Sequence, residues 1–164
     1  MNQATADEMI NKAVKIAIKE YSKTREIEKK RKALHNTKML LKNYKRIEKS
    51  IEEAIYETNQ LKEESLGYDD AEELYINSIL RSKLRSMIVI AHIDKALNTV
   101  RKEYVQKGTP EKYDAFIKCM IDQMNYEDAA SIYFTSKQTI SRWVVDSTKL
   151  VSVQLFGIDG VEMI

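Results

Sequence analysis

The sequence predicts an all-α protein in which long N-terminal helices precede a smaller C-terminal helical domain. Of its 164 residues, 32% are charged, but only four are glycine and one is proline, too few turn residues for a β fold. Apolar residues recur at spacings of three and four, as on helices. Gly108-Thr109-Pro110 is the one place in the sequence where Gly and Pro stand together as a helix-breaking signal. It divides residues 1–107, expected to serve oligomerisation or partner binding, from residues 108–164.

The first two helices are predicted from capping residues and apolar stripes. Thr5 and Glu8 have the spacing of a capping box, and a second helix is expected to begin at Asn36 or Thr37. The first stripe contains Ile10, Val14, Ala17 and Tyr21. The second is a heptad seam of Leu40, Tyr44, Ile47, Ile51, Ala54, Thr58 and Leu61, in which Thr58 is the one polar member.

A third helix is predicted over residues 71–105, after a turn at Gly67. Its seam comprises Ile90, Ile93, Leu97, Val100 and Tyr104. Residues 74–90 are apolar on more than one side, so we expect more than one neighbour there. The simplest arrangement is an antiparallel hairpin of the second and third segments, and self-association through the same seam is the alternative.

Charge is segregated along the chain, although the net charge is only +2. Residues 23–49 contain 11 Lys or Arg against 3 Glu, and residues 50–80 contain 9 Asp or Glu against one Lys. These blocks could pair within the molecule or remain solvated, and the basic block could follow a phosphate backbone.

The C-terminal residues predict a helix-turn-helix. One helix is expected over 110–124, and a short helix over 127–133 is capped by Asn125. A turn at Phe134-Thr135 follows, and Ser136 then caps a helix that runs through Val145 towards Phe156. The residues expected to form the core of this unit are Ala130, Thr135, Ile140 and either Trp143 or Val144.

The start of the last helix carries side chains that suit a DNA groove. The exposed positions are expected to be Lys137, Gln138, Thr139, Ser141 and Arg142. Gln can bond adenine, Arg can bond guanine, and Thr can touch the thymine methyl. The amide end at Ser136 suits a phosphate, and Lys149 is placed for a backbone contact. An ordinary capped helix with a polar surface is the structural alternative.

Three stretches, 109–113, 126–130 and 136–143, resemble the helix-turn-helix of sigma-factor domain four. The chain resembles more closely the phage-encoded transcriptional regulators of the ArpU and RinA type, also at residues 34–44 and 155–158. The resemblance implies control of phage or prophage genes in low-GC Gram-positive bacteria. Two residues depart from the pattern: Phe134 stands where Gly is usual, and Tyr133 where Leu is usual. A Phe at that place is strained if its φ is positive.

The sequence predicts no enzyme, metal site or cofactor. His35 and His92 have no partner at metal-ligand spacing, Cys119 is the single cysteine, and no Gly-rich phosphate loop is present. Cys119 and His92 are expected to lie in the core. The acids at 63–64 and 69–73 are expected to be a solvated turn and helix start. No secretory signal or membrane-spanning run is found, which predicts a cytoplasmic protein of a bacterial host.

The predicted function is therefore a DNA-binding transcriptional regulator, acting as an activator or as a sigma-like factor. Its partners would be double-stranded DNA and, through residues 1–107, RNA polymerase or a second copy of the chain. A small terminase-like packaging subunit is one alternative, which oligomer size would distinguish. A coiled-coil protein adaptor is another, and it would not need Lys137, Gln138 and Arg142 on one helix face.

Overall fold

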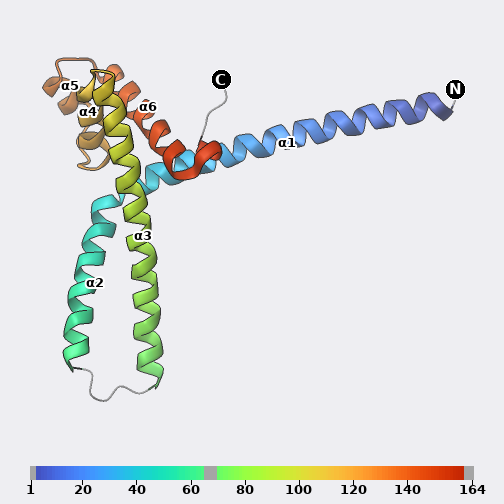
Figure 1. Cartoon of the computed structure of the whole chain (residues 1–164). Helices are drawn as coiled ribbons and strands as arrows, with labels where there is room; N and C mark the ends of the chain where they lie inside the picture. Colours follow the sequence, from blue (N-terminus) through green and yellow to red (C-terminus); the bar gives the residue numbers. More distant parts are fainter. Residues whose placement is uncertain (1–2, 65–69, 161–164) are drawn as a thin grey trace.

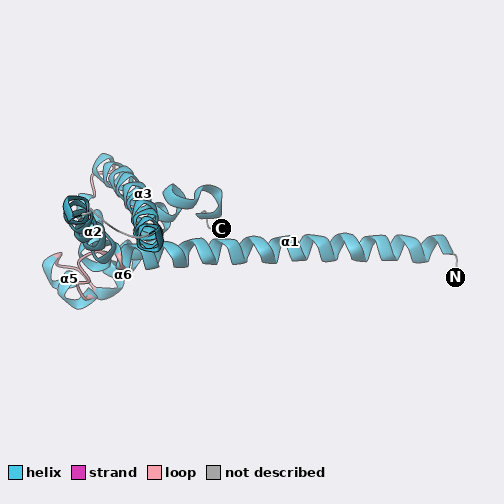
Figure 2. Ribbon diagram, turned by 90° about the horizontal axis from the view of Figure 1, so that it is seen from below, coloured by secondary structure: helices cyan, strands magenta, loops and turns pink. Residues whose placement is uncertain are grey.

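The computed structural model describes residues 3–64 and 70–160, and it confirms the all-α prediction. Side chains are described from residue 11 onward, except at 55, 57–64, 70–74, 76, 158 and 159. The elements are α1 (Gln3–Lys42), α2 (Tyr44–Glu64), α3 (Asp70–Gln106), α4 (Pro110–Met120), α5 (Tyr126–Ile132), α6 (Lys137–Phe156) and the 3₁₀ turn η1 (Gly157–Gly160). The C-terminal helices form a compact body where α1 and α3 meet, and α1 projects from this body as a single rod (Figures 1 and 2).

Helix α1 runs straight through the break that the sequence predicted. It begins at Gln3, near the start expected around Thr5, and Thr37 lies inside it. The Thr37 side chain is buried and its hydroxyl donates to the Ala33 carbonyl at 2.9 Å, so Thr37 caps nothing. The helix ends at Lys42, where the Asn43 amide side chain donates to the Met39 carbonyl at 2.8 Å. Such a local side-chain bond competes with continued helix.

The predicted seam of residues 40–61 is therefore shared by two helices, with Leu40 on α1 and Tyr44 beginning α2. Ile51 and Ala54 are buried as expected, whereas the side chains of Thr58 and Leu61 lie outside the described residues.

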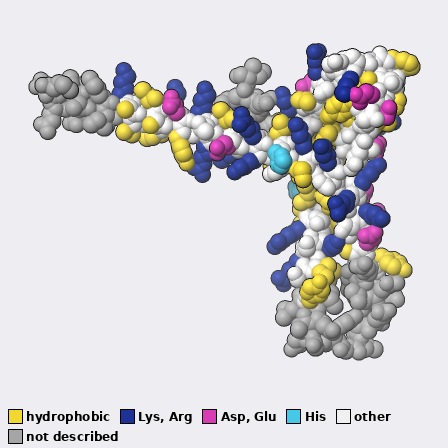
Figure 3. All heavy atoms as spheres, turned by 180° about the vertical axis from the view of Figure 1, so that it is seen from behind, with side chains coloured by type: hydrophobic (Ala, Val, Ile, Leu, Met, Phe, Trp, Pro, Cys, Tyr) yellow, Lys and Arg dark blue, Asp and Glu magenta, His cyan; other side chains and the backbone are white. Residues whose placement is uncertain are grey.

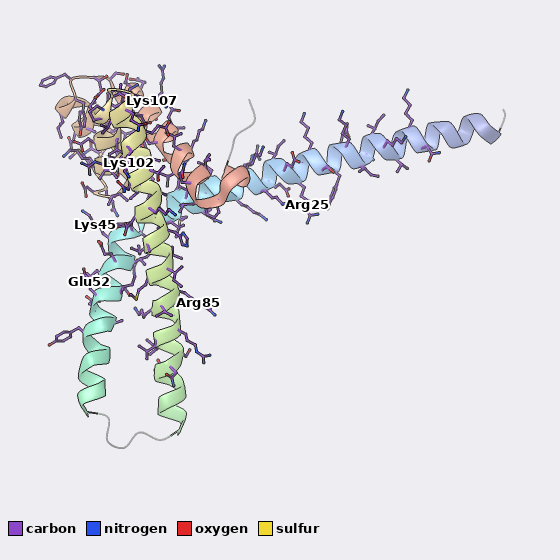
Figure 4. The ribbon with its side chains drawn as sticks, in the orientation of Figure 1. Arg25, Lys45, Glu52, Arg85, Lys102 and Lys107 are labelled. Atoms are coloured by element: carbon purple, nitrogen blue, oxygen red, sulfur yellow. The ribbon has the colours of Figure 1, made fainter. Side chains whose placement is uncertain are left out.

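Helices α2 and α3 form the predicted antiparallel hairpin (Figure 1). The Tyr44 hydroxyl donates to Asp94 at 2.6 Å, and the Lys83 ammonium donates to the Ser50 carbonyl at 3.1 Å. Glu52 and Arg85 point to opposite outer sides of the hairpin (Figure 4). The predicted turn at Gly67 lies outside the described residues.

One buried cluster joins residues from both sides of the predicted boundary at 107/108. Its largest fully buried members include Leu41 of α1, Ile93 and Val100 of α3, Phe116 of α4 and Val151 of α6. Small polar residues on α6, namely Ser147, Thr148 and Ser152, are also fully buried. The Tyr104 hydroxyl and the Ser147 hydroxyl lie 3.0 Å apart and hydrogen-bond across α3 and α6.

Two further contacts lock α1 and α2 onto the loop after α4. The Lys45 ammonium pairs with Asp122 at 2.5 Å, and the Gln123 amide donates to the Lys42 carbonyl at 3.2 Å. The second contact satisfies one of the carbonyl groups at the end of α1 that have no partner within the helix.

Several apolar side chains of the predicted stripes and helices are exposed in the part of the chain that the structure describes. On α3, Leu84, Met87 and Ile88 are exposed, so the second neighbour expected for residues 74–90 does not cover these three side chains. On α1, Val14 and Tyr21 are half exposed or more. His92 is exposed rather than part of the core, whereas Cys119 is buried and its burial raises the pKa of the thiol. None of the described helices has both the length and the apolar character needed to cross a membrane.

Candidate nucleic-acid interface

The candidate interface is built on α5, the following turn and α6, which α4 supports from behind. Helix α4 ends at Met120 instead of the predicted Met124, because the chain then turns through Gln123, whose φ is +58°. The turn brings Asn125 to the start of α5, where its side-chain oxygen accepts the Asp128 amide at 2.8 Å. The predicted cap of the short helix is thereby confirmed.

The turn between α5 and α6 has a left-handed residue at Phe134, the position at which the resembling proteins usually have Gly. Phe134 adopts a φ of +48°, and the Thr135 amide donates to the Ala130 carbonyl at 3.0 Å. These features define a Schellman ending, in which the left-handed residue is usually Gly. The Phe134 side chain is 95% exposed, so no packing within the described chain offsets the backbone strain of the positive φ. Thr135 is only half-buried, not buried as predicted.

Helix α6 begins at the predicted cap and rests on the predicted core. The Ser136 hydroxyl accepts the Thr139 amide at 3.1 Å and lies 3.0 Å from the Thr139 hydroxyl. Ala130, Ile140 and Val144 are buried. The capped end and the buried residues fix the direction in which the first turns of α6 face.

Trp143 and Tyr133 cover the edge of this core. Trp143 is half-buried and packs edge-on against Tyr133, with ring centroids 6.4 Å apart. The Tyr133 hydroxyl donates to Asp114 at 3.2 Å. Burial, helped by the neighbouring Asp114 carboxylate, raises the pKa of Tyr133 to about 12.

Gln138 and Arg142 stand out among the predicted contact residues. Both side chains are exposed on α6, four residues apart, so they share one helix face. Within the described part of the chain, neither side chain makes a hydrogen bond or an ion pair. Ser141, beside Arg142, is half-buried. The first turns of α6 therefore present one amide and one guanidinium to solvent.

Lys137, Ser136 and Thr139 are already engaged within the protein. The Lys137 ammonium pairs with Glu127 of α5, and its hydrogen bond lowers the pKa of that carboxyl. Ser136 and Thr139 bond each other in the cap, and Thr139 is half-buried. In the free protein these three residues hold α6 in place.

Lys149 lies at a groove that the sequence did not reveal. This groove has a volume of about 420 Å³, and Lys107 and Lys112 line it together with the half-buried Lys149. The start of α4, at Thr109, opens onto it, and the Thr109 side chain makes no capping hydrogen bond. Lys107 also pairs with Glu103 at 2.5 Å, and this hydrogen bond raises the Lys107 pKa. The remaining lining residues are Tyr104, Trp143, Asp146 and Leu150.

The grouping of these lysines needed the fold. Lys107 and Lys112 flank Gly108-Thr109-Pro110 in the sequence, but Lys149 reaches them only because α6 packs on α3 and α4. Elsewhere in the described residues, no cluster of His, Cys, Asp and Glu is arranged to hold a metal ion. The acids at 63–64 and 69–73 have no described side chains.

Comparisons with known proteins identify no relative. No family model, curated protein or solved structure matches the chain. The likeness to sigma-factor domain four and to phage regulators therefore stays a resemblance of the residues quoted above.

Proposed function

We propose that this chain is a sequence-specific DNA-binding transcriptional regulator whose α5–turn–α6 unit acts as a helix-turn-helix. The observation that carries the proposal is the exposed pair Gln138 and Arg142 on the first turns of a helix fixed by its cap and core. In helix-turn-helix proteins, these first turns enter the major groove and touch base edges.

The chemistry of the two side chains defines their roles. The Gln138 amide can donate to and accept from one adenine, and the Arg142 guanidinium can donate twice to one guanine. Lys149, Lys112 and Lys107 would contact the phosphate backbone beside the DNA major groove. The amide end of α6 at Ser136 would contact another phosphate.

The regulatory role rests on the resemblance. We infer a phage or prophage regulator that works in the cytoplasm of a bacterial host, as an activator or as a sigma-like factor. In this role, α1 and the α2–α3 hairpin would contact RNA polymerase or a second copy of the chain. The exposed apolar side chains of Leu84 and Ile88 on α3 support a protein contact on the hairpin.

The test begins by sequencing the DNA fragments that the purified chain retains from host and phage genomes. On the enriched site, Gln138→Ala and Arg142→Ala should each weaken binding by about 1–3 kcal/mol, with much less effect on random DNA. Gln154→Ala and Arg85→Ala remove the same side chains from exposed positions elsewhere and should change neither affinity. Equal losses on specific and random DNA would assign Gln138 and Arg142 to phosphate contact instead.

A protein adaptor is the second candidate, because Phe134 is 95% exposed and Ile132, two residues before it, is 48% exposed. Aromatic side chains such as Phe are enriched at contacts between proteins. If the chain retains no DNA fragment even at low salt, the adaptor replaces the regulator. A ring-sized assembly that binds DNA, measured by sedimentation, would indicate the terminase-like packaging subunit instead.

A further inference from the structure

The part of α1 that joins the body carries a row of basic side chains on its solvent side. Ala33, Thr37 and Leu41 are buried against the body. Arg31, His35, Lys38 and Lys42 follow one another at helical spacings of four, three and four, and all four are exposed. At 3.6 residues per turn these four share one face, which we call the α1 basic face.

No acid balances this face within its own helix segment. Residues 29–42 contain six Lys or Arg and no Asp or Glu. Within the described residues, Arg31, Lys38 and Lys42 take part in no ion pair. Lys and Arg side chains gather along α1 and where it meets the body (Figure 3). Arg25, further out, also points away from the helix into open space (Figure 4).

The shape of this charge suits a linear polyanion. From Arg31 to Lys42 the helix rises about 16 Å, and duplex DNA carries one negative charge per roughly 1.7 Å of its axis. A row of cations on a rigid rod can therefore run along several phosphates at once. Phosphate contacts of this kind fix the position of a protein on DNA but carry no sequence information.

We propose that the α1 basic face binds the phosphate backbone of duplex DNA outside the segment read by α6. This inference rests on the proposed DNA-binding function and extends it. The face supplies affinity that does not depend on sequence, whereas Gln138 and Arg142 supply specificity. It lengthens the contact with DNA beyond what a single helix-turn-helix can reach.

The test measures how binding of the full chain to random-sequence duplex depends on salt. The variant combines Arg31→Gln, Lys38→Gln and Lys42→Gln, and a matched control combines Arg81→Gln, Arg85→Gln and Lys102→Gln, which are also exposed, on α3. Loss of three phosphate contacts should reduce the slope of log affinity against log salt by about 2 to 3. The control should keep the wild-type slope, and helix content by circular dichroism should be unchanged in both.

Failure of this inference can be told from failure of the proposed function. If the slope of the α1 variant equals that of wild type, the α1 basic face does not bind DNA, whatever Arg142→Ala does. If the slope falls but Arg142→Ala never alters specificity, the basic face stands and the reading role of α6 fails. Wild-type protein that binds no duplex overturns both. Poly-glutamate that competes as well as DNA per charge would assign the face to an acidic protein and overturn the proposal.

Discussion

Two helix endings in this chain share one backbone geometry but hold different residues, and this predicts an unusual stabilising substitution. At the end of α3, Gly108 has a φ of +68° and the Thr109 amide bonds to the Tyr104 carbonyl at 3.0 Å. At the end of α5, Phe134 has a φ of +48°, and the Thr135 amide bonds to the Ala130 carbonyl, also five residues back, at 3.0 Å. A side chain in this left-handed region costs about 1–2 kcal/mol, which glycine avoids.

Phe134→Gly should therefore make the protein more stable. Relief of strain contributes about 1–2 kcal/mol, and the greater freedom of glycine in the unfolded chain removes about 0.5–1 kcal/mol of it. The phenyl ring is 95% exposed, so its loss removes only about 0.3 kcal/mol of burial. The net gain is about 0.5 kcal/mol, within a range of roughly −0.3 to 1.2, and a chain of this size gains about 2–4 °C in Tm per kcal/mol.

Urea unfolding of the full chain, followed by circular dichroism, measures the effect. Phe134→Ala is the control, because alanine removes the ring but keeps the strain, and it should stay near wild type. Gly108→Ala should be about 1 kcal/mol less stable, since no atom lies within 4 Å of the added Cβ and the loss is the backbone term alone. A Phe134→Gly protein clearly less stable than Phe134→Ala would refute the left-handed turn.

Three further predictions concern other parts of the body. Ala130→Glu should destabilise the protein by at least about 3 kcal/mol in urea unfolding, because it places an unpaired charge in the core; a folded, DNA-binding variant would contradict the packing of α5 on α6. Tyr133 has its pKa raised from the ordinary 10.0 to about 12, so its contribution to stability is complete below pH 10 and is lost as the pH rises towards 12. The Tm of Tyr133→Phe should fall less at alkaline pH than the Tm of wild type. An unchanged pH profile would show that ionisation of Tyr133 does not cause the alkaline loss of stability. Gly160→Ala should lower the Tm, because its Cβ would meet the Ser152 carbonyl oxygen at 2.4 Å, whereas an unaffected Tm would mean that η1 does not pack there.

The sequence predicted those elements whose signals are local. The helix caps Asn125 and Ser136 and the burial of Ile140 depend on a few neighbouring residues, and the structure confirms all three. Phe134 has the positive φ that was named as the condition for strain. The heptad spacing likewise predicted the hairpin of α2 and α3, because the two apolar stripes are close in sequence.

Other features could not be predicted because they depend on distant partners. Thr37 was expected as a cap because of its residue type, but burial against the body keeps it inside α1. Helix α4 ends early because the loop after it contacts α1 and α2 through Gln123 and Asp122. The groove lined by Lys107, Lys112 and Lys149 likewise needs α6 to bring Lys149 to Lys112.

The shared core leads to a prediction about the two halves of the chain. Residues 1–107 and 108–164 were expected to be separate units, but α6 packs on α1 and α3 as well as on α4. Its residues Ser147, Thr148, Val151 and Ser152 are fully buried in the whole chain. A fragment of residues 108–164 leaves this face without its cover, and loses the hydrogen bond between Tyr104 and Ser147.

We therefore expect fragment 108–164 to be much less stable than the full chain, with the second half of α6 incompletely helical. Burial of each apolar side chain contributes about 1.5–3 kcal/mol, so losing the α1 and α3 contacts removes a large part of a stability that is typically 5–15 kcal/mol in total. Mixing the fragment with residues 1–107 should restore the missing helix content, because the two halves rebuild one core. Circular dichroism of each fragment and of the mixture measures this helix content. If fragment 108–164 unfolds at the same urea concentration as the full chain, the C-terminal helices form an independent domain. In that case the contacts with α1 and α3 contribute little to stability.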